Sequence, residues 1–265
     1  STDVTFDREV MDQGIQAIKT FKEIADSYQV KKIVAVATAA FREAKNAEQF
    51  AKEIQQQTGI QVRIINQDEE GILAFRGALA ITPMEPEQVI TWDIGGGSMQ
   101  LTALTKEGTY LVEKGKTASI PFKNAVIEQI EHKDLKTIQT PNPLSIEEMQ
   151  AAVNYAVRLS QDTQPFIKEK ILNPQTHILA VGSIFNYRIR TMMNDPIVKQ
   201  DALETEVMKL AGKTDAELPG GAFAEVSVTN PLLILGYMKG LKINQVQVVD
   251  VNNADGALTY PPYWQ

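Results

Sequence analysis

Apolar positions in the first quarter of the chain follow two alternating spacings. Residues 6–29 and 46–58 carry apolar side chains at the three- and four-residue intervals of an amphipathic helix. Residues 33–38 and 62–65 are short, nearly continuous apolar runs with the length of a buried strand. Helices and strands that alternate in this order predict an α/β protein with a parallel sheet.

Capping residues mark several helix ends. Asn46 precedes the second helix as a candidate N-cap, and Gly59 follows it as a C-terminal stop. Ser145 and Glu148 form a capping-box pattern, which predicts a helix that runs to about Leu159. The same signals predict further helices at 71–80 and 232–241, with Pro231 opening the second of these, and strands at 177–181 and 246–251.

The run from Val89 to Leu101 departs from both spacings. An apolar strand ends in Asp93, three consecutive glycines and Ser98 follow, and apolar residues alternate again from Met99. This order predicts two strands joined by a glycine-rich turn. No helix and no Lys-Ser or Lys-Thr pair follows the glycines, so the run is neither a Walker loop nor a dinucleotide fingerprint.

The glycines and the aspartate together indicate a site for phosphate and metal. Gly95, Gly96 and Gly97 have no side chains, so their backbone N–H groups can converge on one anion. Asp93 at the strand end can hold a hydrated divalent cation beside that anion. A glycine-rich hairpin without a ligand is the alternative interpretation.

Composition narrows the function classes. The chain has 265 residues, 43% of them hydrophobic, which suits one large domain or two small ones. Its net charge of −7 argues against binding to double-stranded nucleic acid, which needs a basic field. There are no cysteines, and His132 and His177 are too few for a histidine metal cluster. No apolar run has the length of a membrane span and no signal peptide is visible, so we expect a cytoplasmic protein without a membrane partner.

Four segments, in order, carry a family resemblance. Residues 36–46 resemble an Ala-Thr-Ser-Ala-x-Arg-x-Ala-x-Asn segment, and residues 65–73 resemble Ile-Ser-Gly-x-Glu-Glu-Ala-x-Leu. Residues 93–98 match Asp-Ile-Gly-Gly-Gly-Ser residue for residue, and residues 119–121 stand in place of Ser-Leu-Pro. Over nearly its whole length the chain resembles the exopolyphosphatase / guanosine pentaphosphatase (Ppx/GppA) phosphatase family.

The resemblance implies the actin-like (ribonuclease H-like) fold, in which two α/β domains close over a phosphate cleft. Residues 1–67 would be the remaining part of the first domain, residues 68–245 the second domain with the phosphate loop, and residues 246–265 a segment that returns toward the first. Family members open with a strand and a second phosphate loop before the first helix seen here, so the first domain is expected to be incomplete. Its exposed sheet edge would favour pairing with another chain, which makes a homodimer one expected state.

The resemblance also implies Mg2+-dependent removal of the terminal phosphate from polyphosphate or from guanosine pentaphosphate. Glu70 takes the place of the catalytic base and Asp93 that of the metal ligand. Such hydrolysis needs a carboxylate that orients water and cations over the developing charge. The phosphate-binding positions are Arg42, Gly95, Gly96, Gly97, Ser98, Gly182 and Ser183. Without the family match, Glu70 would be interpreted as a helix N-terminal acid and Arg42 as a surface ion-pair partner.

Several positions differ from the family pattern. Gln100 stands where the family has a glutamate, and a glutamine carries no charge for a cation. The other differences are Met99 for threonine, Lys123 for glycine, residues 180–184 for a Gly-Gly-Thr turn, and residues 254–258 for Arg-Glu-Gly-Leu-Leu. A catalytically weak or inactive phosphate- or nucleotide-binding module is therefore the alternative hypothesis. A third is a sugar or acid kinase, which would need an adenosine pocket around Gly182 and Ser183.

A channel for a long polyanion would need lysines along its walls. Lys114, Lys116 and Lys123 are the candidates, and each taken singly is expected to be a solvated surface residue.

Overall fold

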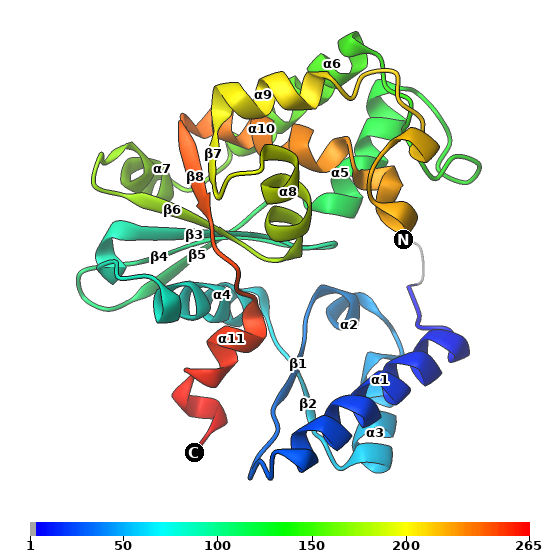
Figure 1. Ribbon diagram of the computed structural model, residues 1–265, viewed down its shortest axis with the longest axis vertical. Coiled ribbons are helices and arrows are strands. Elements are labelled where there is room, and N and C mark those ends of the chain that lie inside the picture. Colours follow the sequence, from blue (N-terminus) through cyan, green and yellow to red (C-terminus); the bar gives the residue numbers. More distant parts are fainter. Residues whose placement is uncertain (1–3) are drawn as a thin grey trace.

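Two sheets organise the chain into two lobes (Figure 1). The structure is a computed structural model that describes residues 4–265; residues 1–3, where the expected first domain begins, lie outside the described residues. The small lobe holds a parallel pair, β1 (Ala35–Ala37) and β2 (Val62–Ile64). The large lobe holds six strands in the order β5-β4-β3-β6-β8-β7. These are β3 (Val89–Ile94), β4 (Met99–Leu104), β5 (Tyr110–Lys114), β6 (His177–Val181), β7 (Ile197–Lys199) and β8 (Gln245–Val248).

Helices cover both sheets. The small sheet is accompanied by α1 (Arg8–Ser27), α2 (Ala39–Glu43) and α3 (Ala47–Thr58). One face of the large sheet carries α4 (Gln67–Ile81), against which α11 (Asn253–Leu258) packs. The remaining helices pack around the core of the other face: α5 (Ser119–Ala125), α6 (Ile146–Ser160), α7 (Pro165–Leu172), α8 (Arg190–Met193), α9 (Gln200–Met208) and α10 (Thr229–Leu241).

Short helical turns complete the chain: η1 (Pro86–Gln88), η2 (Val126–Ile130), η3 (Ile184–Ile189), η4 (Asp215–Glu217), η5 (Gly221–Val226) and η6 (Pro261–Tyr263). The turn η5 packs beside α5, and residues of α5, η3 and η5 line one cavity.

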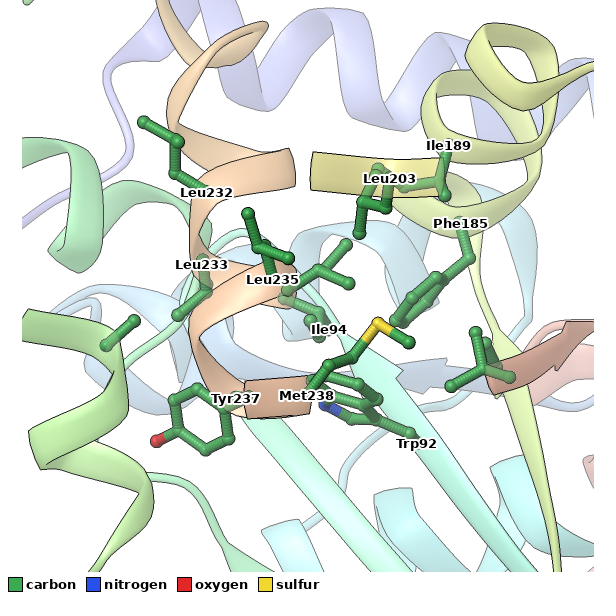
Figure 2. Packing of buried hydrophobic residues seen from close by; sticks show 14 of the residues in the cluster. Trp92, Ile94, Phe185, Ile189, Leu203, Leu232, Leu233, Leu235, Tyr237 and Met238 are labelled. Carbon is green, nitrogen blue, oxygen red and sulfur yellow. The ribbon is translucent and has the colours of Figure 1, made fainter. Parts of the chain in front are cut away.

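Alternation along β3 divides the large lobe into two layers. Ile90, Trp92 and Ile94 point into the main core, where Trp92 packs against Phe185 and Tyr237 (Figure 2). Because successive side chains of a strand point to opposite faces, the intervening residues of β3 face α4. Val89 packs there with Ala74, Phe75 and Ala78 of α4. Asp93 is thus directed away from the main core and toward the helix that carries Glu70.

The small lobe has a much smaller core. Met11 and Ile15 of α1 are buried against Phe50 and Ile54 of α3. A second small cluster packs Val36 of β1 and Ile65 against Ala257 and Tyr263. The two clusters bury far less apolar surface than the core of the large lobe.

Most predicted elements are confirmed, with five corrections. The large sheet is mixed, because β4, β5 and β7 run antiparallel to their neighbours. The helix expected at 71–80 begins at Gln67, so the acids at 68–70 lie inside its first turn. The final strand is 245–248, and the last predicted helix begins at Thr229, ahead of Pro231.

The fifth correction concerns Asn46. It stands at the N-terminus of α3, but its side chain bonds the backbone N–H and carbonyl of Phe6, both at 2.8 Å, and does not cap the helix. The Ser145–Glu148 capping box is present as predicted, and Gly59 ends α3 in the left-handed region.

Candidate active site

The first turn of α4 places Glu70 against the large sheet. The Asn66 side chain accepts a hydrogen bond from the Glu69 N–H at 2.9 Å, and the helix starts about one turn earlier than the apolar pattern alone predicts. Glu70 is 5% exposed and faces the glycine-rich turn between β3 and β4. Burial of a carboxylate requires partners, because an unpaired buried charge is strongly disfavoured.

Three side chains from different segments contact the Glu70 carboxylate. Arg42 of α2 donates from its guanidinium to Glu70 Oε2 at 2.7 Å and to Ser98 Oγ at 3.1 Å. Ser98 Oγ lies 3.3 Å from both oxygens of Glu70, and Gln100 Nε2 lies 3.4 Å from Oε2. Arg42 also donates to the carbonyl of Ile65 at 2.9 Å, which fixes its direction. Arg42 of the small lobe therefore contacts Glu70 and Ser98 of the large lobe.

Ser98 and Gln100 share one face of β4, as the strand alternation predicts. Gln100 is directly opposite Asp93 in the β3–β4 ladder, and it is 1% exposed. Glu70, Asp93 and Gln100 therefore occupy one buried layer between α4 and the sheet.

Asp93 is the second carboxylate of this layer. Burial and the neighbouring Glu70 carboxylate raise the pKa of Asp93 to about 7, and a hydrogen bond from the Asn253 side chain opposes the rise. Gly182, at the end of β6, adopts a φ of +89°, and a Cβ there would lie 2.7 Å from Asp93 Oδ1. Only glycine combines that backbone conformation with such a close approach to the carboxylate.

Two amide oxygens near Asp93 have no partner among the described residues. Gln100 Oε1 and Asn253 Oδ1 are both buried without a hydrogen bond. Leaving a buried acceptor unsatisfied costs roughly 1–3 kcal/mol, so we expect a bound group that interacts with these two oxygens. Carboxylate and amide oxygens are the ligands that hard divalent cations prefer. At the same time, the described residues contain no cluster of three or more acidic, histidine or cysteine side chains that could hold a metal by themselves.

Asn253 is a site residue that sequence reasoning did not identify. It opens α11, where Asn252 and Asp255 form a capping box. That Asn-x-x-Asp pattern could have signalled a helix start, but nothing in the sequence links it to a strand 160 residues earlier.

The glycine-rich turn lies at the open end of this layer. Gly95 donates its N–H to the Ser98 carbonyl at 2.8 Å, so this group is occupied within the turn. Within residues 4–265, the N–H groups of Gly96 and Gly97 have no intramolecular partner. Space around Gly96 is open, whereas a Cβ on Gly97 would lie 3.1 Å from the Cβ of Ala39 in α2. Two backbone donors thus remain for an anion beside Arg42.

The other candidate residues are placed outside this layer. Ser183 is exposed one residue beyond Gly182. Lys114 forms an exposed ion pair with Asp68 at 2.7 Å, and Lys116 is exposed. Lys123 is not a solvated surface lysine: it is 5% exposed and pairs with Glu225 at 3.1 Å. His132 and His177 are both exposed and do not approach the site.

The first half of the chain is similar to known proteins in sequence. Residues 1–122 match the model of the Ppx/GppA phosphatase family. A stretch of 103 residues, 38% of this chain, is 28% identical to the bifunctional 3-dehydroquinate synthase/phosphatase of Fusobacterium nucleatum. The match spans only 16% of that protein.

Solved structures extend the similarity to the whole fold. The Aquifex aeolicus PPX-GPPA enzyme superposes with a TM-score of 0.74 at 19% identity, over 96% of this chain and 83% of that one. An exopolyphosphatase from Cytophaga hutchinsonii superposes with a TM-score of 0.76 at 18% identity, over 97% and 83% of the two chains. The chain therefore has the actin-like α/β fold of these proteins.

The match to the Ppx/GppA phosphatase family thus covers residues 1–122, a little under half of the chain, and the shared fold extends over nearly all of it. The resemblance expected from the sequence is confirmed. Among the described residues, none of the helices combines the length and apolar character needed to cross a membrane.

Proposed function

We propose that this chain removes the terminal phosphate of a phosphoanhydride, either inorganic polyphosphate or guanosine pentaphosphate, with Mg2+ as the cofactor. The observation that carries the proposal is the contact of Arg42, Glu70 and Ser98 beside a second buried carboxylate, Asp93. Phosphoanhydride hydrolysis needs an oriented water and positive charge over the phosphoryl oxygens.

Arg42 and the turn supply the phosphate site. The free N–H groups of Gly96 and Gly97 point to an anion that a protein of net charge −7 could attract only through local donors. Three of the five guanidinium N–H groups of Arg42 are used by Ile65, Glu70 and Ser98, and the remaining ones can donate to a phosphate oxygen.

Glu70 is the residue we assign to the attacking water. Its carboxylate lies at the base of the same site and accepts from Ser98 and Gln100. A carboxylate in this position can hold and orient a water for in-line attack, and can take its proton as the bond to phosphorus forms.

Mg2+ fits the residues around Asp93. Asp93 and the unpartnered oxygens of Gln100 and Asn253 would hold it. With a single carboxylate and neutral amides as direct ligands, several positions are left for water and substrate oxygens, as Mg2+ prefers. When bound, the ion supplies positive charge beside the phosphate oxygens.

One observation favours the second candidate, a binding module with weak or no turnover. Gln100 is buried opposite Asp93 and carries no charge. The layer therefore has one carboxylate fewer for a cation than the family pattern, which has a glutamate at this position. Such a protein would bind the anion without cleaving it.

Phosphate release from polyphosphate and from guanosine pentaphosphate, measured with and without Mg2+, tests the proposal. We expect Mg2+-dependent release that is lost in Glu70→Gln, while that variant still binds the substrate. Asp68→Asn, two residues earlier in the same helical turn but exposed, is the matched control and should keep the rate. Binding without release by the unaltered chain would favour the binding module.

A further inference from the structure

Tyr263, in the turn η6, is buried between the two lobes. It is 2% exposed, although Pro262 and Trp264 on either side of it are exposed. Its hydroxyl donates to Glu69 Oε1 of α4 at 3.0 Å. The guanidinium of Arg63, in β2, lies over its ring at 5.2 Å from the centroid. Tyr263 therefore contacts the large lobe through its hydroxyl and the small lobe through its ring.

Both kinds of contact are strong enough to fix side chains. A hydrogen bond to a carboxylate is roughly twice as strong as one between neutral groups, so the hydroxyl of Tyr263 holds Glu69 in place. The ring belongs to the apolar cluster of Ile65, Leu73 and Ala257, and a tyrosine ring buries a large apolar area. The residue thus has two separate functions, one for its hydroxyl and one for its ring.

The neighbours of Tyr263 stand directly behind the Arg42–Glu70 ion pair. Glu69 precedes Glu70 in the first turn of α4. Ile65 accepts a hydrogen bond from the Arg42 guanidinium through its carbonyl at 2.9 Å, while its side chain is buried in the cluster of Tyr263. The hydroxyl of Tyr263 therefore supports the Glu70 side of the ion pair, and the ring supports the Arg42 side.

We infer that Tyr263 is a positioning residue for the candidate active site: its hydroxyl orients Glu70 through Glu69, and its ring orients Arg42 through Ile65. The inference rests on the proposed function for the roles of Arg42 and Glu70. It adds a residue outside their site that sets how the two meet. Loss of the hydroxyl should impair the step that uses the attacking water, whereas loss of the ring should impair phosphate binding as well.

Steady-state kinetics of phosphate release separate the two effects. Tyr263→Phe keeps the ring, so kcat should fall about tenfold, as for the loss of a hydrogen bond to a charged group, while KM stays the same. Tyr263→Ala should lower kcat at least as much and also raise KM, because Arg42 loses its support. Trp264→Ala is the matched control and should change neither constant, since the Trp264 indole bonds the Ala257 carbonyl within the same segment.

Pyrophosphate binding tests the role of the ring without turnover. In a calorimetric titration with Mg2+ present, Tyr263→Ala should bind pyrophosphate about tenfold more weakly than the unaltered chain, and Tyr263→Phe should bind it equally well. In an Arg42→Gln background, Tyr263→Ala should cause little further loss, because two residues that act through one contact are not additive.

Hydrogen exchange tests the role of the hydroxyl without turnover. The Glu70 N–H bonds the Asn66 carbonyl at 3.0 Å in the first turn of α4. Its exchange, followed by NMR, should be about tenfold faster in Tyr263→Phe and unchanged in Trp264→Ala.

Three results would each overturn the inference: unchanged Glu70 exchange in Tyr263→Phe, a full further loss of pyrophosphate affinity on adding Tyr263→Ala to Arg42→Gln, or the same changes in Trp264→Ala. Failure of the proposed function would appear separately, as an unaltered chain that releases no phosphate while the expected differences in pyrophosphate binding and exchange are present.

Discussion

Two buried carboxylates, Glu70 and Asp93, lie in one layer, but their surroundings differ. Glu70 is neutralised by Arg42 at 2.7 Å. Asp93 is hydrogen-bonded to the Asn253 side chain, and burial and the Glu70 carboxylate raise its pKa to about 7. The two groups are therefore suited to different tasks. Glu70 can hold a water beside the Arg42 guanidinium, and Asp93 can bind a metal.

The raised pKa of Asp93 makes the metal-free protein sensitive to pH. The folded protein keeps a proton on Asp93 that the unfolded chain releases near pH 4, so this group contributes stability at low pH that is lost as the pH rises to about 7. When a chelator keeps the protein free of metal, the free energy of unfolding should fall by an amount on the order of a few kcal/mol between about pH 4 and pH 7. Asp93→Asn should remove most of the fall, while Asp250→Asn, at an exposed position, should retain it. Denaturant titrations at several pH values measure this, and an unchanged slope in Asp93→Asn would contradict it.

Gln100 is the residue whose replacement should strengthen metal binding. Gln100 is 1% exposed and lies opposite Asp93, so Gln100→Glu adds a third buried carboxylate to the layer of Glu70 and Asp93. The metal-free variant should be less stable by roughly 1–3 kcal/mol, because the new charge is buried without a cation. Mg2+ affinity should rise about tenfold, as read from the Mg2+ dependence of the melting temperature. Gln175→Glu, at an exposed position, serves as control, and identical Mg2+ responses in both variants would make Gln100 structural.

Sequence reasoning reached the side chains that belong to short motifs. Arg42, Glu70, Asp93 and Ser98 were all predicted as site residues, and the structure places them together. Asn253 was not, because its proximity to Asp93 depends on how the end of the chain packs and on no local pattern. Lys123 was misjudged for a similar reason: Glu225, its partner, is 102 residues away in sequence.

At the scale of elements, the contact of α4 with α11 positions the site. Gly256 packs so closely that a Cβ there would lie 1.8 Å from the backbone carbonyl oxygen of Leu73. Gly77 faces the same contact, with an added Cβ 3.1 Å from the Gly256 nitrogen. Arg76 donates to the Thr259 carbonyl just beyond α11. The helix that carries Glu70 is thus joined to the helix that carries Asn253 through backbone contacts that tolerate no side chain.

Gly256→Ala should therefore separate these two helices. The new methyl group would meet backbone, which cannot move aside, so we expect a loss of at least 1–3 kcal/mol in the free energy of unfolding. The displacement would also withdraw Asn253 from Asp93 and weaken Mg2+ binding. Leu258→Ala, at an exposed position of the same short helix, should change little. Thermal melts with and without Mg2+ check both effects; a Gly256→Ala variant with native stability and Mg2+ response would show that the contact is dispensable.

Elements with a clear periodicity were predicted and others were not. The helix α6 has a capping box and one buried face, and both signals are visible in the sequence. The helices α7 and α9 have 8 and 9 residues, and each buries only two, which is too few to establish a period. The strand pair β3–β4 was predicted, but the antiparallel pairing of β7 was missed because β7 has three residues and its partner β8 comes 45 residues later. Pairing across such distances leaves no local signature.

At the scale of the whole molecule, the two lobes should differ in stability. The large lobe has an extensive core, while the small lobe depends on the contacts of α1 with α3 and on two short strands. Local opening should follow this difference, so amides of α1 and α3 should exchange with solvent far faster than those of β3 and α10. Arg42→Gln should raise exchange in α2 without affecting α10, since Arg42 joins the lobes. Hydrogen-exchange mass spectrometry measures both, and uniform exchange across the chain would contradict the prediction.

The strand order also constrains how the chain is made. The strand β8 is the last to be synthesised, yet it lies inside the sheet between β6 and β7. During translation, at about 5–20 residues per second, β6 remains an open edge and β7 has no partner until residues 245–248 have left the ribosome. The large lobe can complete its sheet only after residues 245–248 have emerged, and the layer of Glu70, Asp93 and Asn253 can close only after residue 253. Termination before residue 245 would therefore yield chains in which β6 is an exposed parallel edge, prone to aggregate and to be captured by chaperones.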